Sequence, residues 1–181
     1  MITSPVLRAA TRADLPAIGE LMQRSVLEVF PLFHDERETA AAARHLTEPD
    51  VVLVDDATYY VHDAAGEIVA CGGWSRRDKL YTGSGAAPDD DRLLDPATEP
   101  ARVRAMFVRG DSTRRGLGRA ILDRCVAAAR VAGYRSLVLM ATLPGEPFYR
   151  AYGFREVRRT DVVLADGTVI GGVSMEYPLS S

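Results

Sequence analysis

The hydrophobic and polar positions along the chain change their period several times, and each change marks a predicted element. Short runs of β-branched and aromatic residues are typical of strands, whereas apolar residues that recur every three or four positions are typical of helices. Strands are predicted at residues 6–9, 51–54, 58–61, 68–74, 103–108, 136–141, 157–164 and 168–177. Helices are predicted after Thr11 or Asp14 up to Pro31, and at residues 35–46, 115–132 and 147–152.

The order of these elements predicts a mixed sheet in a single domain of residues 1–181. Turn residues at 62–67 and 165–167 join neighbouring strands into hairpins near both ends of the chain. Between the hairpins, residues 103–141 form a strand–helix–strand unit, which predicts two parallel strands joined by a right-handed crossover. The sequence shows no repeat and no linker that would divide the chain further.

A long polar stretch interrupts the pattern at residues 75–100. It contains Gly83, Gly85, Pro88 and the acidic run Asp89–Asp91. Loops of this length are uncommon inside a compact domain and usually have a function or move. Solvated aspartates at a loop tip explain the acidic run better than a metal site does, so we predict no bound metal.

The loop between strand 103–108 and helix 115–132 has the composition of an anion site. Its sequence is Arg114-Arg115-Gly116-Leu117-Gly118-Arg119. Backbone N–H groups at a helix N-terminus lack intrahelical partners, and the helix dipole adds partial positive charge there. The two glycines remove Cβ atoms that would keep a bulky anion from the backbone, and the arginines add charge suited to phosphate. The loop therefore predicts a phosphate-binding site.

Two other phosphate motifs do not fit this loop. A P-loop requires lysine followed by serine or threonine, and the chain contains no such pair. A dinucleotide-binding loop requires a third small residue where this chain has Ile121, and an acidic residue near the end of the next strand, where it has Met140-Ala141-Thr142. The loop alone leaves a second interpretation open, a glycine turn with exposed arginines and no ligand.

A second motif follows at residues 148–154, where Phe148-Tyr149 and Gly153-Phe154 match the pattern F-Y-x-x-x-G-F at every fixed position. Together with the loop, which places Gly116 and Gly118 at the glycine positions of Q/R-x-x-G-x-G/A, the chain resembles the GNAT superfamily of N-acetyltransferases. Two motifs in this order, flanked by the expected strand and helices, are far more specific than either alone.

The resemblance implies a fold and a reaction. The implied fold is α/β (α+β), with a mixed, mostly antiparallel central sheet of about seven strands, a central parallel strand–helix–strand unit and helices on both faces. The implied activity is the direct transfer of an acetyl group from acetyl-CoA to a primary amine of a small molecule or peptide. Tyr149 is the implied catalytic acid, which protonates the departing CoA thiolate; its alternative role is a core aromatic beside Phe148.

The resemblance also implies where the cofactor binds. The pantetheine arm is expected to pair with the backbone of the strand at 106–108 as if it were another strand, and the loop N–H groups are expected to hold the pyrophosphate. A backbone N–H near Phe107 or Val108 is placed to polarise the thioester carbonyl. The implied cofactor-binding residues are Met106, Phe107, Val108, Arg114, Arg115, Gly116, Leu117, Gly118 and Arg119.

The chain departs from the family pattern at two positions. Thr113 stands where the loop pattern has glutamine or arginine, and Thr142 stands where the family often has asparagine. We therefore expect a weaker or different cofactor contact from Thr142. The general base is open between Glu99, Glu146, a water chain and an acceptor amine of lowered pKa.

Composition limits the partners. The 181 residues are 47% hydrophobic and 26% charged with a formal net charge of −3, which argues against nucleic acid or an anionic membrane as a partner for the whole surface. Cys71 and Cys125 lie in apolar stretches and are expected to be buried. The N-terminus has no signal-peptide pattern, so a cytoplasmic location is expected.

Three further predictions concern the acceptor pocket, the assembly and the alternative to an enzyme. Trp74 and Tyr81 are candidates for an acceptor pocket, although core packing explains Trp74 equally well. A homodimer is a candidate assembly, since folds of this kind often dimerise. The alternative to an enzyme is a non-catalytic acyl-CoA-binding regulatory module, which would keep the loop but would not need Tyr149.

Overall fold

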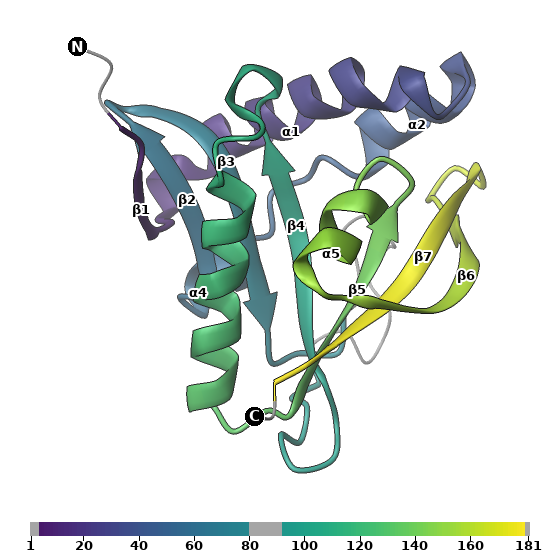
Figure 1. The fold of residues 1–181 in the computed structure, drawn as a ribbon. Coiled ribbons are helices and arrows are strands. Elements are labelled where there is room, and N and C mark those ends of the chain that lie inside the picture. The colour runs from purple at the N-terminus through teal and green to yellow at the C-terminus, as the bar shows by residue number, and fades with distance from the viewer. Residues whose placement is uncertain (1–3, 80–91, 180–181) are drawn as a thin grey trace.

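The chain, described at residues 4–79 and 92–179 in a computed structural model, forms a seven-stranded mixed sheet with helices on both faces (Figure 1). The strand order is β1-β2-β3-β4-β5-β7-β6, and β4–β5 is the one parallel pair among these strands. The predicted fold class is confirmed. The strands are β1 (Val6–Ala9), β2 (Tyr59–Ala64), β3 (Glu67–Ser75), β4 (Ala101–Val108), β5 (Ser136–Thr142), β6 (Arg155–Val163) and β7 (Val169–Pro178).

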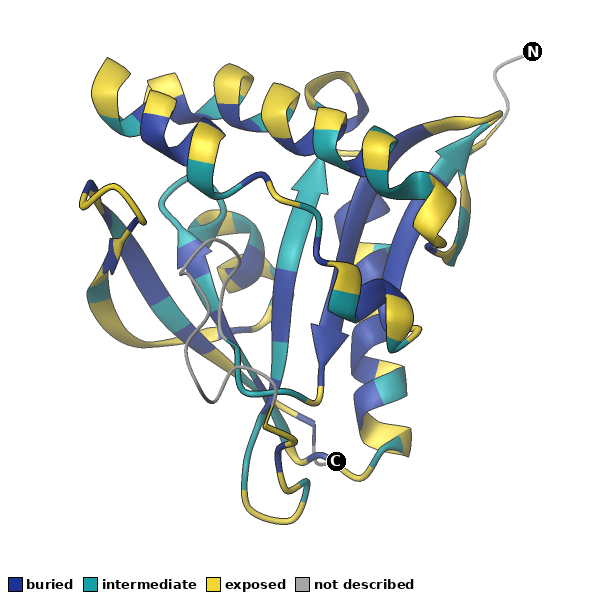
Figure 2. Cartoon of the chain, turned by 180° about the vertical axis from the view of Figure 1, so that it is seen from behind, coloured by how far each residue is buried: buried dark blue, intermediate teal, exposed yellow. Residues whose placement is uncertain are grey.

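The helices form two layers, one on each face of the sheet. Helices α1, α2 and α3 cover one face, and α4 and α5 cover the other (Figures 1 and 2). The α-helices are α1 (Leu15–Val29), α2 (Glu36–His45), α3 (Val51–Asp55), α4 (Leu117–Val131) and α5 (Glu146–Tyr152), and three short 3₁₀ turns are η1 (Arg12–Asp14), η2 (Phe30–Leu32) and η3 (Gly110–Ser112).

Thr11 and Asp14 both shape the start of α1. Thr11 N–H donates to Asp14 Oδ2 at 2.7 Å in a capping box around η1, and Asp14 then serves as the N-cap of α1 itself. Pro16 falls in the first turn of the helix, where its missing N–H has no intrahelical acceptor to lose. Both predicted starts therefore describe part of the same entry into α1.

The prediction of a strand at residues 51–54 is wrong. Those residues begin α3, a helix whose N-cap Asp50 accepts a hydrogen bond from Leu53 N–H at 3.2 Å. A short apolar run has no period that separates a buried helix from a strand. The capping side chain decides here, because it satisfies the first free N–H groups of a helix.

The first hairpin turns later than predicted. Positive φ angles at Ala65 (54°) and Gly66 (92°) place a tight two-residue turn between β2 and β3. His62, predicted to begin the turn, is therefore a buried residue of β2. Because of this shift, the His62 side chain contacts Leu117 in the first turn of α4.

The core lies on both faces of β3 and β4. An apolar face of α4 packs on one side, and its buried members include Ile121, Leu122, Cys125 and Ala129. Gly133 follows this helix with a positive φ of 91°, an angle that favours glycine at a helix C-terminus. Strand β5 lies between β4 and β7. No helix in the described ranges is both long and apolar enough to cross a membrane.

Candidate active site

Strands β4 and β5 separate soon after they begin. Their pairing is limited to Ala101 with Leu137 and Arg102 with Val138. Beyond Arg102, the edge of β4 that faces β5 has no partner strand among the described residues. An unpaired strand edge exposes N–H and C=O groups that must bind water or a ligand.

A bulge in β4 lies within this separation. Ala105 has a φ of +59°, and the register against β3 shifts between Cys71 and Gly73. The Tyr59 hydroxyl donates to the Ala105 carbonyl at 2.9 Å, which helps to hold a backbone conformation that alanine seldom adopts. A bulge bends its strand and redirects the residues that follow. Here those residues are Met106, Phe107 and Val108.

A cavity of about 590 Å³ fills the space between the separated strands. That volume is in the range of small-molecule and cofactor sites. Its lining contains every predicted cofactor-binding residue except the exposed Arg115, and it also contains Tyr149 and Thr142. The remaining lining residues are Ser25, Val26, Val29, Phe30, Leu46, Val103, Arg104, Ala105, Ser112, Thr113, Leu139, Met140, Pro144, Gly145 and Phe148.

The loop at the start of α4 is open to an anion. Gly116 is the N-cap with a φ of +77°, and no side chain caps the free N–H groups of the first turn. A Cβ at Gly116 would meet nothing within 4 Å, so glycine is required there by the backbone angle. Arg114 also has a positive φ, of 61°, which tightens the turn before the helix.

Gly118 has a packing role that the sequence did not predict, in addition to its predicted role in the approach of the anion. A Cβ at this position would lie 2.9 Å from Cζ of Phe148, the residue before Tyr149. The glycine therefore lets α4 and α5 approach each other, and both helices then border the cavity. The two motifs that identify the family meet at this contact.

His62 contacts the same loop through Leu117, at the start of α4. The sequence patterns did not predict this role. Its side chain is buried on β2, and Nε2 lies 3.0 Å from the carbonyl oxygen of Leu117, so the neutral ring donates from Nε2. Burial lowers the pKa of His62 more than this hydrogen bond raises it. Nothing local in the sequence marks this role, because the partners are 55 residues apart.

Tyr149 lies on α5 with its ring buried in the core and at the cavity wall. Its ring packs against Phe148 at 5.2 Å and Phe154 at 5.8 Å between centroids. Burial raises the pKa of Tyr149 well above its ordinary value, so the hydroxyl is protonated at neutral pH. That hydroxyl has no hydrogen bond to any part of the chain that the structure describes.

The two cysteines are buried in the core, as predicted, and they lack the character of nucleophiles. Burial raises the pKa of Cys71 to about 12 and raises that of Cys125 further. A thiol is a strong nucleophile only as the thiolate. Neither residue lines the cavity.

The two glutamates considered as bases lie outside the cavity. Glu99 precedes β4 at its paired end and forms an ion pair with Arg92 at 2.8 Å. Glu146 forms ion pairs with Arg150 and Arg159, which lower its pKa. Among the described residues, the cavity lining contains no aspartate, glutamate or histidine.

The aromatic residues predicted for an acceptor pocket have separate outcomes. Trp74 is a core residue, packed against Tyr134 at 6.0 Å and donating to the Tyr60 hydroxyl at 3.3 Å. Tyr81 lies outside the described residues, as do Gly83, Gly85, Pro88 and the acidic run. The described residues contain no group of three potential metal ligands.

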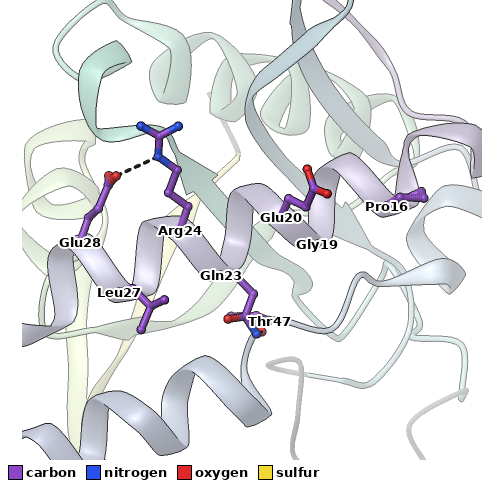
Figure 3. Close-up of a pocket in the computed structure, with 8 residues that line it drawn as sticks. All are labelled: Pro16, Gly19, Glu20, Gln23, Arg24, Leu27, Glu28 and Thr47. Carbon is purple, nitrogen blue, oxygen red and sulfur yellow. Dashed lines mark hydrogen bonds and ion pairs between the residues drawn. The ribbon is translucent and has the colours of Figure 1, made fainter.

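A second depression, of about 760 Å³, lies on the outer surface of α1 (Figure 3). Arg24 and Glu28 form an ion pair along its wall at 2.8 Å. It is a shallow surface feature, and neither predicted motif borders it. The candidate active site is therefore the cavity between β4 and β5.

Solved structures share this whole architecture. A GCN5-related N-acetyltransferase from Rhodopseudomonas palustris superposes with a TM-score of 0.73 at 15% identity, covering 98% of both chains. The PaiA N-acetyltransferase of Thermoplasma acidophilum, solved with coenzyme A, gives 0.67 at 12% identity, covering 97% of this chain and 99% of its own. YncA of Salmonella typhimurium, a putative acetyltransferase solved with acetyl-CoA, gives 0.62 at 17% identity, covering 99% and 96%. These three superpositions show that the chain has the fold of these acetyltransferase structures.

A match between the sequence and a family model shows the family. Residues 55–156 match the model of the acetyltransferase (GNAT) domain, which spans the sheet from β2 to the start of β6 and includes both motifs. The chain belongs to the GNAT acetyltransferase family. A comparison with curated protein sequences gave no match.

Proposed function

We propose that this protein is an N-acetyltransferase that moves an acetyl group from acetyl-CoA directly to a primary amine of a small molecule or peptide. One observation carries the proposal: the open edge of β4, the uncapped start of α4 and Tyr149 border a single cavity. The Thermoplasma and Salmonella structures, which contain coenzyme A and acetyl-CoA, support the choice of cofactor.

The cavity fits the parts of the cofactor. The unpaired backbone at 106–108 offers donors and acceptors to an amide-containing arm such as pantetheine. The first-turn N–H groups at 117–119 offer donors to a pyrophosphate. Arg114 and Arg119 line the cavity and add charge, whereas the exposed Arg115 contributes at longer range.

The proposed chemistry needs few side chains. The bound cofactor supplies a thioester, and a backbone N–H near Phe107 or Val108 polarises its carbonyl. The neutral amine nitrogen attacks the carbonyl carbon, the C–S bond breaks, and Tyr149 donates its proton to the departing sulfur. The proton lost by the nitrogen passes to water, and the Tyr149 phenolate is reprotonated from water. Because the buried Cys71 and Cys125 keep their protons, transfer is direct and does not pass through an acetyl-cysteine.

A non-catalytic acyl-CoA-binding module is the second candidate. The absence of an acidic or imidazole side chain from the described lining favours it, since no carboxylate or imidazole of that lining is in place to take the amine proton. The position of Tyr149 at the cavity wall favours the enzyme, because a binding module has no use for a proton donor there. A cytoplasmic location and a homodimer stay predictions.

Thiol release from acetyl-CoA across a panel of primary amines tests the proposal. Amine-dependent release, with one N-acetyl product per thiol by mass spectrometry, is the expected result. Saturable acetyl-CoA binding by calorimetry without any amine-dependent release would support the binding module instead. Failure to bind acetyl-CoA would remove both candidates.

A further inference from the structure

The cavity between β4 and β5 contains one cation that the cofactor loop does not explain. Arg104, Arg114 and Arg119 are the charged residues of its described lining. Arg114 and Arg119 border the start of α4, where the cofactor phosphates are proposed to bind. Arg104 belongs to β4 and immediately precedes the bulge at Ala105, so its position calls for a separate explanation.

Two contacts fix the Arg104 side chain. Nε donates to Asp50 Oδ2 at 2.8 Å, and Nη1 donates to the Lys79 carbonyl at 2.7 Å. The Arg104 side chain is 2% exposed and that of Asp50 is 6% exposed, so the pair is a buried one. Asp50 also caps α3, which anchors its carboxylate. The guanidinium is held in one orientation before any ligand arrives.

Part of the guanidinium is left unused. A guanidinium has five N–H donors, and Nη2 carries two of them. Nη2 of Arg104 has no hydrogen-bond partner in the ranges 4–79 and 92–179. A buried arginine with free donors at the wall of a cavity is suited to an oxygen anion, which accepts charge-assisted hydrogen bonds.

The partner of Arg104 places its guanidinium on the face of the sheet opposite to α4. Asp50 begins α3, which covers the same face as α1, whereas α4 and its phosphate loop cover the opposite face (Figure 2). On that first face, the cavity is lined by Ser25, Val29 and Phe30 of α1 and η2. The unused donors are therefore remote from the proposed phosphate site.

We propose that Arg104 binds a carboxylate carried by the acceptor, so that the acceptor class is a small amine with its own carboxylate, such as an amino acid. This inference rests on the proposed acetyltransferase function. The Asp50 carboxylate compensates the charge of the guanidinium, so recognition depends on the directed N–H donors of Nη2. A polyamine would instead bring a second ammonium to a lining whose described residues offer it no carboxylate.

Matched acceptors test this inference. Amino acids and their amides, with spermidine added, differ in the carboxylate while keeping the primary amine. We expect kcat/KM for the acids to exceed that for their amides by at least about tenfold, the effect of losing one charge-assisted hydrogen bond. Equal kcat/KM for acids and amides, or a preference for spermidine, would overturn the inference while leaving acetyl transfer established.

Paired variants assign the selectivity to Arg104. Arg104→Gln alone strands the buried Asp50 carboxylate and destabilises the fold, so the informative variant is Asp50→Asn/Arg104→Gln. We expect its acid-to-amide ratio to fall to about 1, with the dissociation constant for acetyl-CoA unchanged. The matched control is Asp78→Asn/Arg102→Gln, which removes a neighbouring β4 pair at 2.9 Å that does not line the cavity. If the control variant lost the preference for acids over amides, or if Asp50→Asn/Arg104→Gln kept that preference, the assignment of the selectivity to Arg104 would be contradicted.

A binding measurement separates this inference from the proposed function. Titration of the acids and amides into the complex with coenzyme A needs no turnover. Tighter binding of the acids, abolished in Asp50→Asn/Arg104→Gln, supports the carboxylate site even in a protein that releases no thiol. Equal binding of acids and amides would remove the site whatever the activity.

Discussion

At the scale of single residues, Tyr149 is the group through which the proposed reaction depends on the cavity. Its ring is fixed between Phe148 and Phe154, and its hydroxyl has no other hydrogen bond among the described residues. A proton donor must keep its proton until the thiolate forms, and burial raises the pKa of Tyr149 in the direction that ensures this. A hydroxyl without another partner is also free to turn to the sulfur.

Replacing this hydroxyl tests the role. We predict that Tyr149→Phe lowers kcat by roughly 10²-fold, because the thiolate then leaves without a proton. Acetyl-CoA affinity, measured by calorimetry, is expected to change little, since the ring and its packing are kept. An unchanged kcat would end the assignment of Tyr149 as the acid.

Tyr152→Phe is the matched control. The Tyr152 hydroxyl donates to Asp123 at 2.7 Å, and this residue does not line the cavity. We predict that the kcat of Tyr152→Phe stays within about twofold of the wild type. Loss of a catalytic proton donor would lower kcat by about 10²-fold or more. A loss equal to that of Tyr149→Phe would point to general damage to α5.

The residues of the site differ in how far the sequence predicts them. The loop and Tyr149 are predictable because their motifs are local and ordered along the chain. His62, Ser25 and Arg104 are not, because each reaches the site through the pairing or packing of segments far apart in sequence. Arg115 is exposed and does not line the cavity, so its predicted contact with the cofactor stays a prediction.

At the scale of elements, the approach of α4 to α5 depends on Gly118. We predict that Gly118→Val weakens acetyl-CoA binding at least tenfold, because the Cβ would lie 2.9 Å from Phe148 and force that ring to move at the cavity wall. Calorimetry measures the effect.

A compensating variant distinguishes two causes of that loss. In Gly118→Val/Phe148→Ala the ring is absent, so we expect acetyl-CoA binding to recover in part. No recovery would indicate that valine blocks the approach of the anion to the backbone, as the sequence alone suggested. Wild-type affinity in Gly118→Val itself would contradict both explanations.

The entry into α1 makes stability depend on acid pH. Arg8 donates to both oxygens of Asp14, at 2.8 and 2.9 Å, and this pairing lowers the pKa of Asp14 to about 2. A carboxyl with a lowered pKa stabilises the fold above its ordinary value of 3.8 and loses that contribution as the pH falls toward 2. After allowance for solvent screening, the contribution is about 1 kcal/mol.

Urea unfolding of wild type and Asp14→Asn checks this linkage. We predict a stability difference that is constant above pH 5 and shrinks between pH 4 and pH 2. Asp55→Asn, which removes the more exposed ion pair with Arg12, should have a smaller effect. A difference for Asp14→Asn that did not vary with pH would show that capping, and not charge, is the cause.

The elements also show where sequence patterns fail. Residues 51–54 are four apolar or β-branched residues, and such a run suits a buried strand or a buried helix equally. The Asp50 side chain, which caps α3 and binds Arg104, resolves the choice. One residue thus explains both the wrong prediction and the orientation of Arg104.

At the scale of the whole molecule, the separation of β4 from β5 organises the site. The order of elements predicts the parallel pair, but not that the pairing ends at Arg102 or that a bulge at Ala105 follows within the separation. These depend on tertiary contacts that no local pattern contains. The parting exposes a strand edge beside a helix start, the arrangement on which the proposed acetyl-CoA site depends.

Hydrogen exchange with and without saturating acetyl-CoA tests this central claim most directly. The account predicts slower exchange in peptides covering residues 103–108 and 114–119, where the open edge of β4 and the start of α4 gain hydrogen bonds. Residues 155–163 of the β6 edge and residues 16–24 beside the surface depression should be unchanged. Protection confined to those control segments, or no protection at residues 103–119, would contradict it.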